Sequence, residues 1–122
     1  GKHNLASCEA YTPQGGGWRS VEPLSMPRCS AAVAVLEGTM YCCGGWDGQK
    51  FLSEVECFRP SGGGWKEAPS MLTARSYGAV VAAGGRLVAC GGWDGVSSRR
   101  LDTVEELVPA VEGESRGWVQ KA

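Results

Sequence analysis

The string Gly-Gly-Trp-Asp-Gly occurs twice in this chain, at residues 44–48 and again at 91–95. The two copies lie 47 residues apart, and much of the flanking sequence repeats with the same spacing. Three further pairs keep this interval: Leu5 and Leu52, Trp18 and Trp65, and Arg28 and Arg75. A fixed period of about 20 to 50 residues indicates a repeat architecture. We therefore expect binding through loops that recur once per repeat, instead of through one catalytic pocket.

The repeat contains strand-like segments separated by turn residues. Gly84-Gly85 and Glu37-Gly38 are each expected to form a two-residue hairpin turn between adjacent strands. The expected strands are 30–36, 39–43 and 52–58 around the first copy, and 65–68, 77–83, 86–90 and 101–107 around the second. A preceding half-unit is expected to contribute 5–11 and 18–21. No segment has the period of an amphipathic helix, so the sequence predicts an all-β fold.

The first two strands of each unit are apolar at nearly every position, as in residues 31–36. A strand that is apolar on both faces is expected to be covered on both faces. The short hairpin turns make the sheets antiparallel. Small antiparallel sheets that stack face to face satisfy both conditions, and this arrangement is typical of β-propeller blades.

The order of the motifs resembles the kelch repeat: Met, Arg, an apolar strand, Gly-Gly, Asp-Gly, Leu-x-x-Val-Glu and a spaced Trp. The matching residues of the first unit are Met26, Arg28, Tyr41, Gly44, Gly45, Asp47, Gly48, Leu52, Val55, Glu56, Phe58, Pro60 and Trp65. Those of the second unit are Met71, Arg75, Gly91, Gly92, Asp94, Gly95, Leu101, Val104, Glu105, Pro109 and Trp118. The second half of a preceding unit is matched by Leu5, Cys8, Glu9, Tyr11, Pro13 and Trp18.

This resemblance implies a partial kelch β-propeller, with half a blade followed by two four-stranded antiparallel blades. The half-blade is expected over residues 1–26, and the two kelch repeats over 27–71 and 72–122. Propellers close with about four to eight blades. We therefore expect either that the chain is part of a longer propeller or that several copies associate to close one.

Composition restricts the partners. The net charge of −1 and the pI near 5.8 do not indicate a nucleic-acid or membrane surface. No apolar run approaches the roughly 20 residues of a transmembrane helix. The six cysteines include no Cys-x-x-Cys pair and most lie within apolar runs, so reduced, buried thiols are expected. Reduced thiols favour the cytoplasm, with the nucleus as the alternative.

The sequence predicts neither catalysis nor a metal or other cofactor. His3 is the only histidine and lies near the terminus, so no Ser-His-acid or Cys-His arrangement can be assembled. Asp47 and Asp94 recur before glycine, where the demands of a turn explain them. Some kelch-like propellers are copper oxidases, but the histidine and tyrosine ligands of such a site are lacking here. The vicinal Cys42-Cys43 pair points to opposite faces of a strand, which disfavours a disulfide sensor.

Two groups of residues recur with the period. Glu9, Glu56 and Glu105 recur in the third strand, while Arg28 and Arg75 recur at the connector between blades. These acids and arginines are expected to pair within the scaffold, and the alternative is that the arginines face a ligand carboxylate. The expected structural residues are Gly44, Gly45, Gly91, Gly92, Glu56, Glu105, Trp18, Trp65 and Trp118.

Trp46 and Trp93 follow the double glycines, in turns that should project from one end of the propeller. A turn does not need a large aromatic residue, so each either folds onto its own blade or anchors a partner, as tryptophan and arginine often do. The candidate partner-binding residues are Trp46, Asp47, Gln49, Lys50, Phe51, Trp93, Asp94, Ser97, Ser98, Arg99, Arg100, Arg28, Ser30, Arg75 and Tyr77.

The function implied by the resemblance is protein or peptide binding. The motifs are similar to those of BTB–kelch proteins, whose propellers recruit substrates to cullin-based ubiquitin ligases. A cytoskeletal, actin-associated scaffold protein is the alternative, and a fragment of a kelch-fold enzyme is a third hypothesis.

Overall fold

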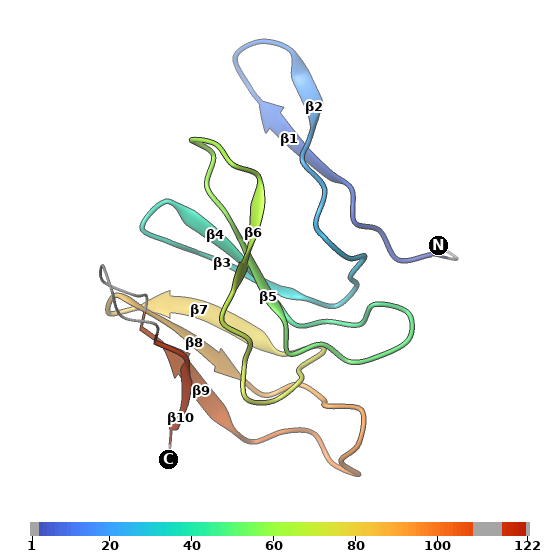
Figure 1. Cartoon of the computed structure of the whole chain (residues 1–122), viewed down its shortest axis with the longest axis vertical. Helices are drawn as coiled ribbons and strands as arrows, with labels where there is room; N and C mark the ends of the chain where they lie inside the picture. The colour runs from blue at the N-terminus through green and yellow to red at the C-terminus, as the bar shows by residue number, and fades with distance from the viewer. Residues whose placement is uncertain (1–2, 109–115, 122) are drawn as a thin grey trace.

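In the computed structural model, residues 3–108 and 116–121 are described (Figure 1). Within them, every regular element is a β-strand. The strands are β1 Cys8–Thr12, β2 Gly17–Val21, β3 Ala32–Leu36, β4 Thr39–Cys43, β5 Val55–Phe58, β6 Trp65–Ala68, β7 Ala79–Ala83, β8 Arg86–Cys90, β9 Val104–Leu107 and β10 Trp118–Lys121. The prediction of an all-β chain is confirmed. Pro109, expected to end the third strand of the second unit, lies outside the described residues.

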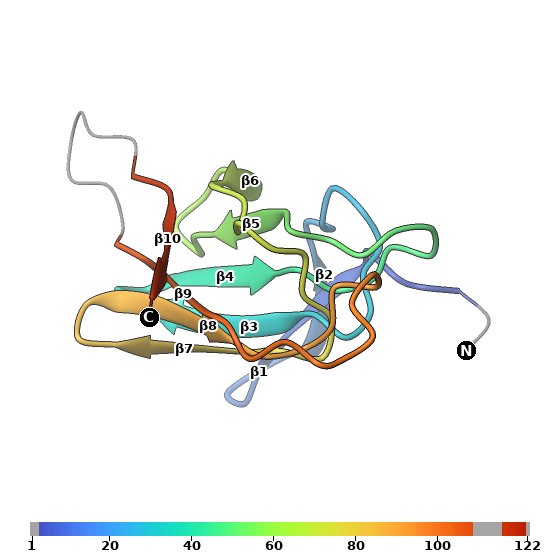
Figure 2. The same ribbon diagram turned by 90° about the horizontal axis from the view of Figure 1, so that it is seen from below.

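The strands form three antiparallel sheets that follow one another along the chain (Figures 1 and 2). We call them the N-terminal hairpin (β1-β2), the middle blade (β3-β4-β5-β6) and the C-terminal blade (β7-β8-β9-β10). Each blade is a simple meander in which consecutive strands pair. Half a blade followed by two four-stranded blades is the arrangement expected of a partial kelch propeller.

Several strands begin later than the sequence predicted. The third strand of the middle blade begins at Val55 instead of Leu52, because the backbone of Leu52 pairs outside the ladder. Its N–H donates to Gly45 O (2.9 Å), and its carbonyl accepts from Arg75 N in the next connector (3.0 Å). Ser30 has a φ of +57°, which is not an extended conformation, so β3 begins only at Ala32.

The same differences recur in the second unit. Leu101 N donates to Gly92 O (2.8 Å), and the third strand is confined to Val104–Leu107. Tyr77, with a φ of +59°, precedes a first strand that begins at Ala79. The equivalent residues of the two units thus leave the strand for the same reason.

The main core lies between the two blades. The inner strand β3 packs alongside β7, and the small side chains of Ala32 and Ala34 leave room for this close approach. Leu87 and Ala89 of β8 are 0% exposed at this contact. Burial of an aliphatic side chain of valine or leucine size adds about 1.5 to 3 kcal/mol to the free energy of unfolding. The two units are therefore held together by the apolar contact between the blades.

The opposite face of the middle blade is not covered in the same way. Val33 and Val35 alternate with the core alanines and are 53% and 57% exposed. Met40 is the cross-strand partner of Val35 and lines a groove beside the N-terminal hairpin. The expectation that inner strands are covered on both faces is therefore met on one face only in the described chain, because no complete sheet packs on the second.

Candidate functional site

The loops 44–54 and 91–103 project from the same end of the two blades, on the right of Figures 1 and 2. Each loop begins with a double glycine, and the second glycine lies against the connector entering its own blade. Gly45 has a φ of +101°, and a Cβ there would lie 2.6 Å from Cys29 O. The adjacent Trp46 then exchanges two backbone hydrogen bonds of 2.9 Å with Cys29. The loop is thus fixed to the connector before its aromatic side chain is presented.

The two loops bring together four side chains, which we call the loop ladder: Trp46, Phe51, Trp93 and Arg100. The Phe51 ring lies 4.6 Å from the Trp46 ring and 4.9 Å from the Trp93 ring, measured between centroids. The Arg100 guanidinium lies 5.3 Å from the Trp93 ring centroid, within cation–π range. All three aromatic side chains are half-buried. The ladder therefore joins the two units across this end of the molecule and leaves aromatic surface accessible.

Glycine at position 95 is needed for this contact. Gly95 has a φ of +84°, and a Cβ there would overlap the Phe51 ring. The equivalent Gly48 lies against Asn4, whose side-chain amide donates to Trp46 O (3.2 Å). Residues 4, 51 and 100 each directly precede the repeated leucine of their unit. Asn4 and Phe51 thus each reach the tryptophan of the next unit, and Arg100 covers Trp93 of its own unit.

Asp47 and Asp94 shape the loops. Asp47 Oδ1 accepts from the backbone N–H groups of Gln49 (2.7 Å) and Lys50 (2.8 Å). Asp94 Oδ1 likewise accepts from the backbone N–H groups of Val96 and Ser97. These backbone hydrogen bonds hold the pKa of both carboxyl groups below its usual value. Their principal role is therefore local, in holding each turn.

A shallow hollow of about 340 Å³ lies beside the ladder in the second loop. It is lined by Trp93, Ser97, Ser98, Arg99 and Arg100. Trp93 Nε1 donates to Ser97 O (3.0 Å), which holds the indole against the loop. In the first loop, the exposed Lys50 pairs with Glu54 at 2.7 Å. Most of the candidate partner-binding residues thus lie on one end of the molecule, with two exposed arginines beside an aromatic ring.

Arg28 and Arg75 do not belong to this accessible surface. Their side chains are only 1% and 3% exposed. Arg28 pairs with Glu56 at 2.9 Å and Arg75 with Glu105 at 3.0 Å. Each guanidinium also donates to two backbone carbonyls of its own blade, as in the bond from Arg28 to Gly44 O (2.9 Å). We therefore correct their assignment as partner-binding residues: both side chains are buried and most of their donors are bonded within the scaffold, although Arg28 Nε has no hydrogen-bond partner among the described residues.

Ser30 and Tyr77 lie at the inner ends of the connectors. Tyr77 N donates to Ser30 O (3.1 Å), which links the two connectors directly. The Tyr77 side chain is 74% exposed, whereas Ser30 is partly buried. Tyr77 thus stays a candidate for partner contact, and the backbone of Ser30 has a structural part.

The spaced tryptophans connect each blade to the segment before it. Trp65 Nε1 donates to Glu22 O (3.1 Å), and Trp118 Nε1 donates to Pro69 O (2.8 Å). Trp118 is 4% exposed, whereas Trp18 is 66% exposed and packs against Tyr11 at 5.3 Å. Trp65 and Trp118 therefore support the scaffold, and Trp18 lies on the less covered side of the molecule.

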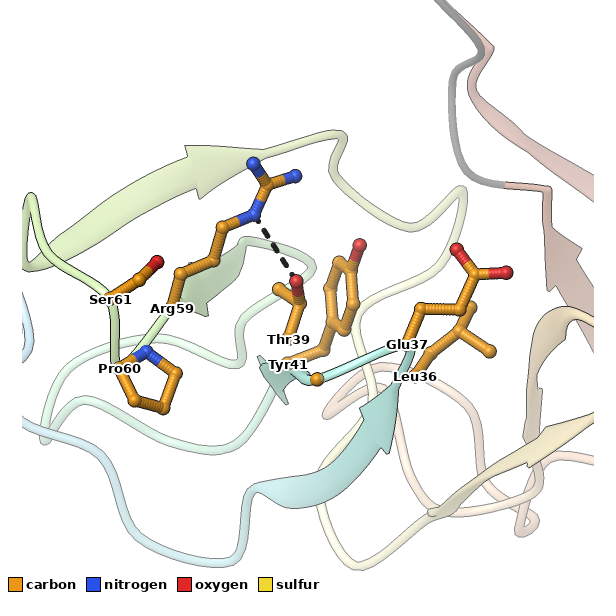
Figure 3. Close-up of a pocket in the computed structure, with 8 residues that line it drawn as sticks. Leu36, Glu37, Thr39, Tyr41, Arg59, Pro60 and Ser61 are labelled. Carbon is orange, nitrogen blue, oxygen red and sulfur yellow. Dashed lines mark hydrogen bonds between the residues drawn. The ribbon is translucent and has the colours of Figure 1, made fainter.

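Sequence reasoning missed a second hollow, at the opposite end of the middle blade (Figure 3). It has a volume of about 560 Å³ and includes Glu37, Tyr41 and Arg59 in its lining. Arg59 Nε donates to Thr39 Oγ1 (3.2 Å) across it. Burial raises the pKa of the Tyr41 hydroxyl above its usual value. Of its lining residues only Tyr41 and Pro60 belong to the repeated motif, so no sequence signal marked the hollow as a site.

Among the described residues, no His, Cys, Asp and Glu side chains gather in a group of three that could hold a metal ion. The same residues contain no helix long and apolar enough to cross a membrane. All six cysteines are free thiols. Burial raises the pKa of the Cys43 thiol to about 12.

Comparison with known proteins agrees with this geometry. The family model of the Kelch motif matches residues 27–72 and 74–110, more than half of the chain. The chain therefore belongs to the kelch-repeat family, whose propellers are protein-interaction modules.

The relatives are kelch-like proteins. Human Kelch-like protein 4 is 44% identical over 52 residues, which cover 42% of this chain and 7% of the relative. Mouse Kelch-like protein 1 is 44% identical over 45 residues, covering 37% of this chain and 6% of the relative. The zebrafish Kelch repeat and BTB domain-containing protein 12 is 38% identical over 52 residues, which cover 43% of this chain and 8% of the relative. The chain thus spans less than a tenth of these relatives, which point to an interaction domain instead of an enzyme.

Proposed function

We propose that the loop ladder is the site at which this protein binds a protein or peptide partner. The observation that carries the proposal is the contact of Phe51 with both Trp46 and Trp93. It forms an aromatic surface across two units that the strand ladders themselves do not require. Half-buried tryptophans flanked by arginine are the side chains that most often dominate protein interfaces. Rigid aromatic groups also lose little conformational entropy on binding.

The finer proposal is that the bound partner is a substrate of a cullin-based ubiquitin ligase, for which this propeller is the recognition part. Its support is the resemblance to BTB–kelch proteins, together with the relative named for kelch repeats and a BTB domain. The six free thiols support a cytoplasmic location, with the nucleus as the alternative. A cytoskeletal scaffold role stays the competing hypothesis, and actin cosedimentation tests it.

The test is an alanine scan of the ladder and of the neighbouring Arg99, with two measurements on each variant, the melting temperature and partner retention. Tagged wild-type protein and the Trp46→Ala, Trp93→Ala, Arg99→Ala and Arg100→Ala variants are compared by quantitative affinity capture. Proteins retained by the wild type and lost from the variants are then titrated directly. A tryptophan hot spot should cost about 2 kcal/mol, or roughly a 30-fold loss of affinity.

The matched control is Trp65→Phe, because Trp65 lies in β6, away from the ladder, and acts through the scaffold. It should lower the melting temperature and leave affinity per folded molecule unchanged. If Trp46→Ala and Trp93→Ala behave as this control does, the tryptophans are packing residues and the proposed site is wrong. Gly95→Ala provides a further check, since it displaces Phe51 without removing an aromatic ring.

A further inference from the structure

The hollow of Figure 3 lies on one face of the middle blade, at the end away from the loop ladder. We call it the turn hollow, because the turn at Glu37-Gly38 and the loop that follows β5 contribute most of its lining. Thr39 and Tyr41 of β4 share the face of Leu36, which packs into the core toward the C-terminal blade. The turn hollow is therefore separate from the groove beside the N-terminal hairpin, which lies on the other face.

The Arg59 guanidinium lines the turn hollow without an acid to balance it. Arg59 directly follows β5 and continues its register with β4, so that it lies beside Thr39. Its Nε donates to Thr39 Oγ1 (3.2 Å), and no acidic side chain of the described chain pairs with it. In the C-terminal blade, Arg86 takes the place of Thr39 and pairs with Glu106 at 3.0 Å. The two terminal nitrogens of Arg59 are thus available to an external carboxylate.

The Tyr41 hydroxyl is a second available donor. It forms no hydrogen bond within the described part of the chain. In Figure 3 the Tyr41 ring lies between Arg59 and Glu37, and the polar ends of the three side chains point the same way. Burial is the main cause of the raised pKa of Tyr41, and the charges of Arg59 and Glu37 act on this pKa in opposite directions. The hydroxyl is therefore protonated at neutral pH and able to donate.

Glu37 places a charge at a position that favours glycine. Its φ is +51°, and the equivalent residue of the second unit is Gly84. A residue with a Cβ is strained in this conformation, and such strain is concentrated at functional sites. Glu37 is exposed and has no ion-pair partner among the described residues. The turn therefore keeps a glutamate that makes it less stable and that no contact within the described chain explains.

We propose that the turn hollow binds a segment of a protein partner in which an acidic and a basic side chain are neighbours. The acidic side chain accepts from Arg59 and Tyr41, because a guanidinium with two free nitrogens matches a planar carboxylate. The basic side chain donates to Glu37. The hollow has a volume of about 560 Å³, but most of its lining residues are exposed, so it would not enclose a small molecule as such sites usually do. The inference does not rest on the loop ladder.

The probe is the acetylated and amidated peptide Gly-Ser-Glu-Lys-Ser-Gly, added to the full chain. NMR follows the Nε–Hε cross-peak of Arg59 and the backbone amides of residues 37–41. We expect saturable shifts at these groups and none in the loops 44–54 and 91–103. If the Arg59 cross-peak does not shift at up to about 10 mM peptide, where even two weak charge pairs would give binding, the proposal is wrong.

Peptide variants test each charge of the ligand. Glutamine in place of the glutamate, or in place of the lysine, should weaken binding by about 5-fold or more, as expected for the loss of a charge-assisted hydrogen bond. Phosphoserine in place of the glutamate should not improve binding, because Glu37 repels the additional negative charge. Tighter binding of the phosphopeptide, or equal binding of the glutamine peptides, would overturn the assigned chemistry.

Protein variants distinguish binding from a structural role. Tyr41→Phe removes only a hydroxyl without a partner in the described chain, so it should weaken binding and leave the melting temperature unchanged. Glu37→Gly should weaken binding and raise the melting temperature, because glycine adopts this φ without strain. If both variants bind the peptide as the wild type does, the proposed contacts are wrong.

The matched control is Arg86→Gln, compared with Arg59→Gln. Arg86 is also an exposed arginine beside a hairpin turn, but it is paired with Glu106 and does not line the turn hollow. Arg59→Gln should abolish the shifts, and Arg86→Gln should leave the affinity unchanged. Equal losses in the two variants would show that the peptide is attracted by positive charge in general, and the proposed site would be wrong.

Discussion

Replacement of Glu105 by glutamine should destabilise the C-terminal blade more than any other single-atom change in the chain. Its carboxylate is 1% exposed and accepts from three donors. Arg75 Nε lies 3.0 Å away, and the backbone N–H groups of Leu72 and Thr73 complete the set. Glutamine keeps the shape and one acceptor oxygen, but it removes the charge that balances the guanidinium.

The expected magnitude follows from what remains buried. Arg75 stays in place through its bonds to Gly91 O (2.9 Å) and to Thr103 O (3.0 Å), so its charge stays inside without a carboxylate. Breaking a buried ion pair by removing one partner costs about 3 to 5 kcal/mol. This is a large part of the 5 to 15 kcal/mol by which domains are usually stable. A fall of about 10 °C or more in melting temperature is expected.

The assay is urea unfolding followed by tryptophan fluorescence, at constant salt. The matched control is Glu54→Gln, because the Glu54 ion pair with Lys50 lies on the surface, and its midpoint should stay within error of the wild type. A midpoint for Glu105→Gln within that error would refute the reasoning. Arg75→Met combined with Glu105→Leu separates the contributions. Apolar replacement of both partners often restores stability, but here it leaves backbone groups unpaired, so we expect incomplete recovery.

Two further outcomes are expected. Trp118→Phe removes the indole hydrogen bond to Pro69 O, and Trp118 is 4% exposed, so the free energy of unfolding in urea should fall by about 1 to 2 kcal/mol. Trp18→Phe, at an exposed position, should leave the free energy of unfolding almost unchanged. Equal losses in the two variants would contradict this account. Burial raises the pKa of Cys43 to about 12, so its thiol stays protonated at pH 8. Alkylation of the native protein should therefore modify the exposed Cys90 and spare Cys43 by mass spectrometry, and early Cys43 labelling would show that the interblade core opens.

The sequence predicted the strands where local chemistry decides them. Gly84-Gly85 and Glu37-Gly38 impose two-residue turns, and both hairpins form at those residues. The starts of the strands were less predictable, because they depend on contacts between units. Leu52 has the composition of a strand residue, yet its backbone pairs with a glycine of the loop and an arginine of the next connector. Such partners are far away in the sequence and leave no periodic signal.

The candidate site was predictable only in part. The position of Trp46 and Trp93 in loops at one end follows from alternating strand direction. The contact of Phe51 with Trp93 does not, because it depends on how one blade is rotated against the next. Arg28 and Arg75 show the converse difficulty. Their spacing is compatible with a ligand-facing or a scaffold role, and only the 1% and 3% exposure of their side chains distinguishes the two.

Comparison of the units distinguishes residues that support the scaffold from residues that we propose contact a partner. Arg28 and Arg75 recur because each pairs with the equivalent glutamate and the equivalent backbone carbonyls of its own blade. The residue directly before each repeated leucine forms no such buried pair, and it differs among the three units: Asn4, Phe51 and Arg100. Each nevertheless contacts a tryptophan of the loop ladder: Asn4 by a hydrogen bond to the Trp46 backbone, Phe51 by ring packing and Arg100 by a cation–π contact. An amide, an aromatic ring and a cation held on the same tryptophan frame would contact different groups of a partner. If the loop ladder is the binding site proposed above, its specificity would change through one position per repeat, at no cost to the buried pairs beneath it.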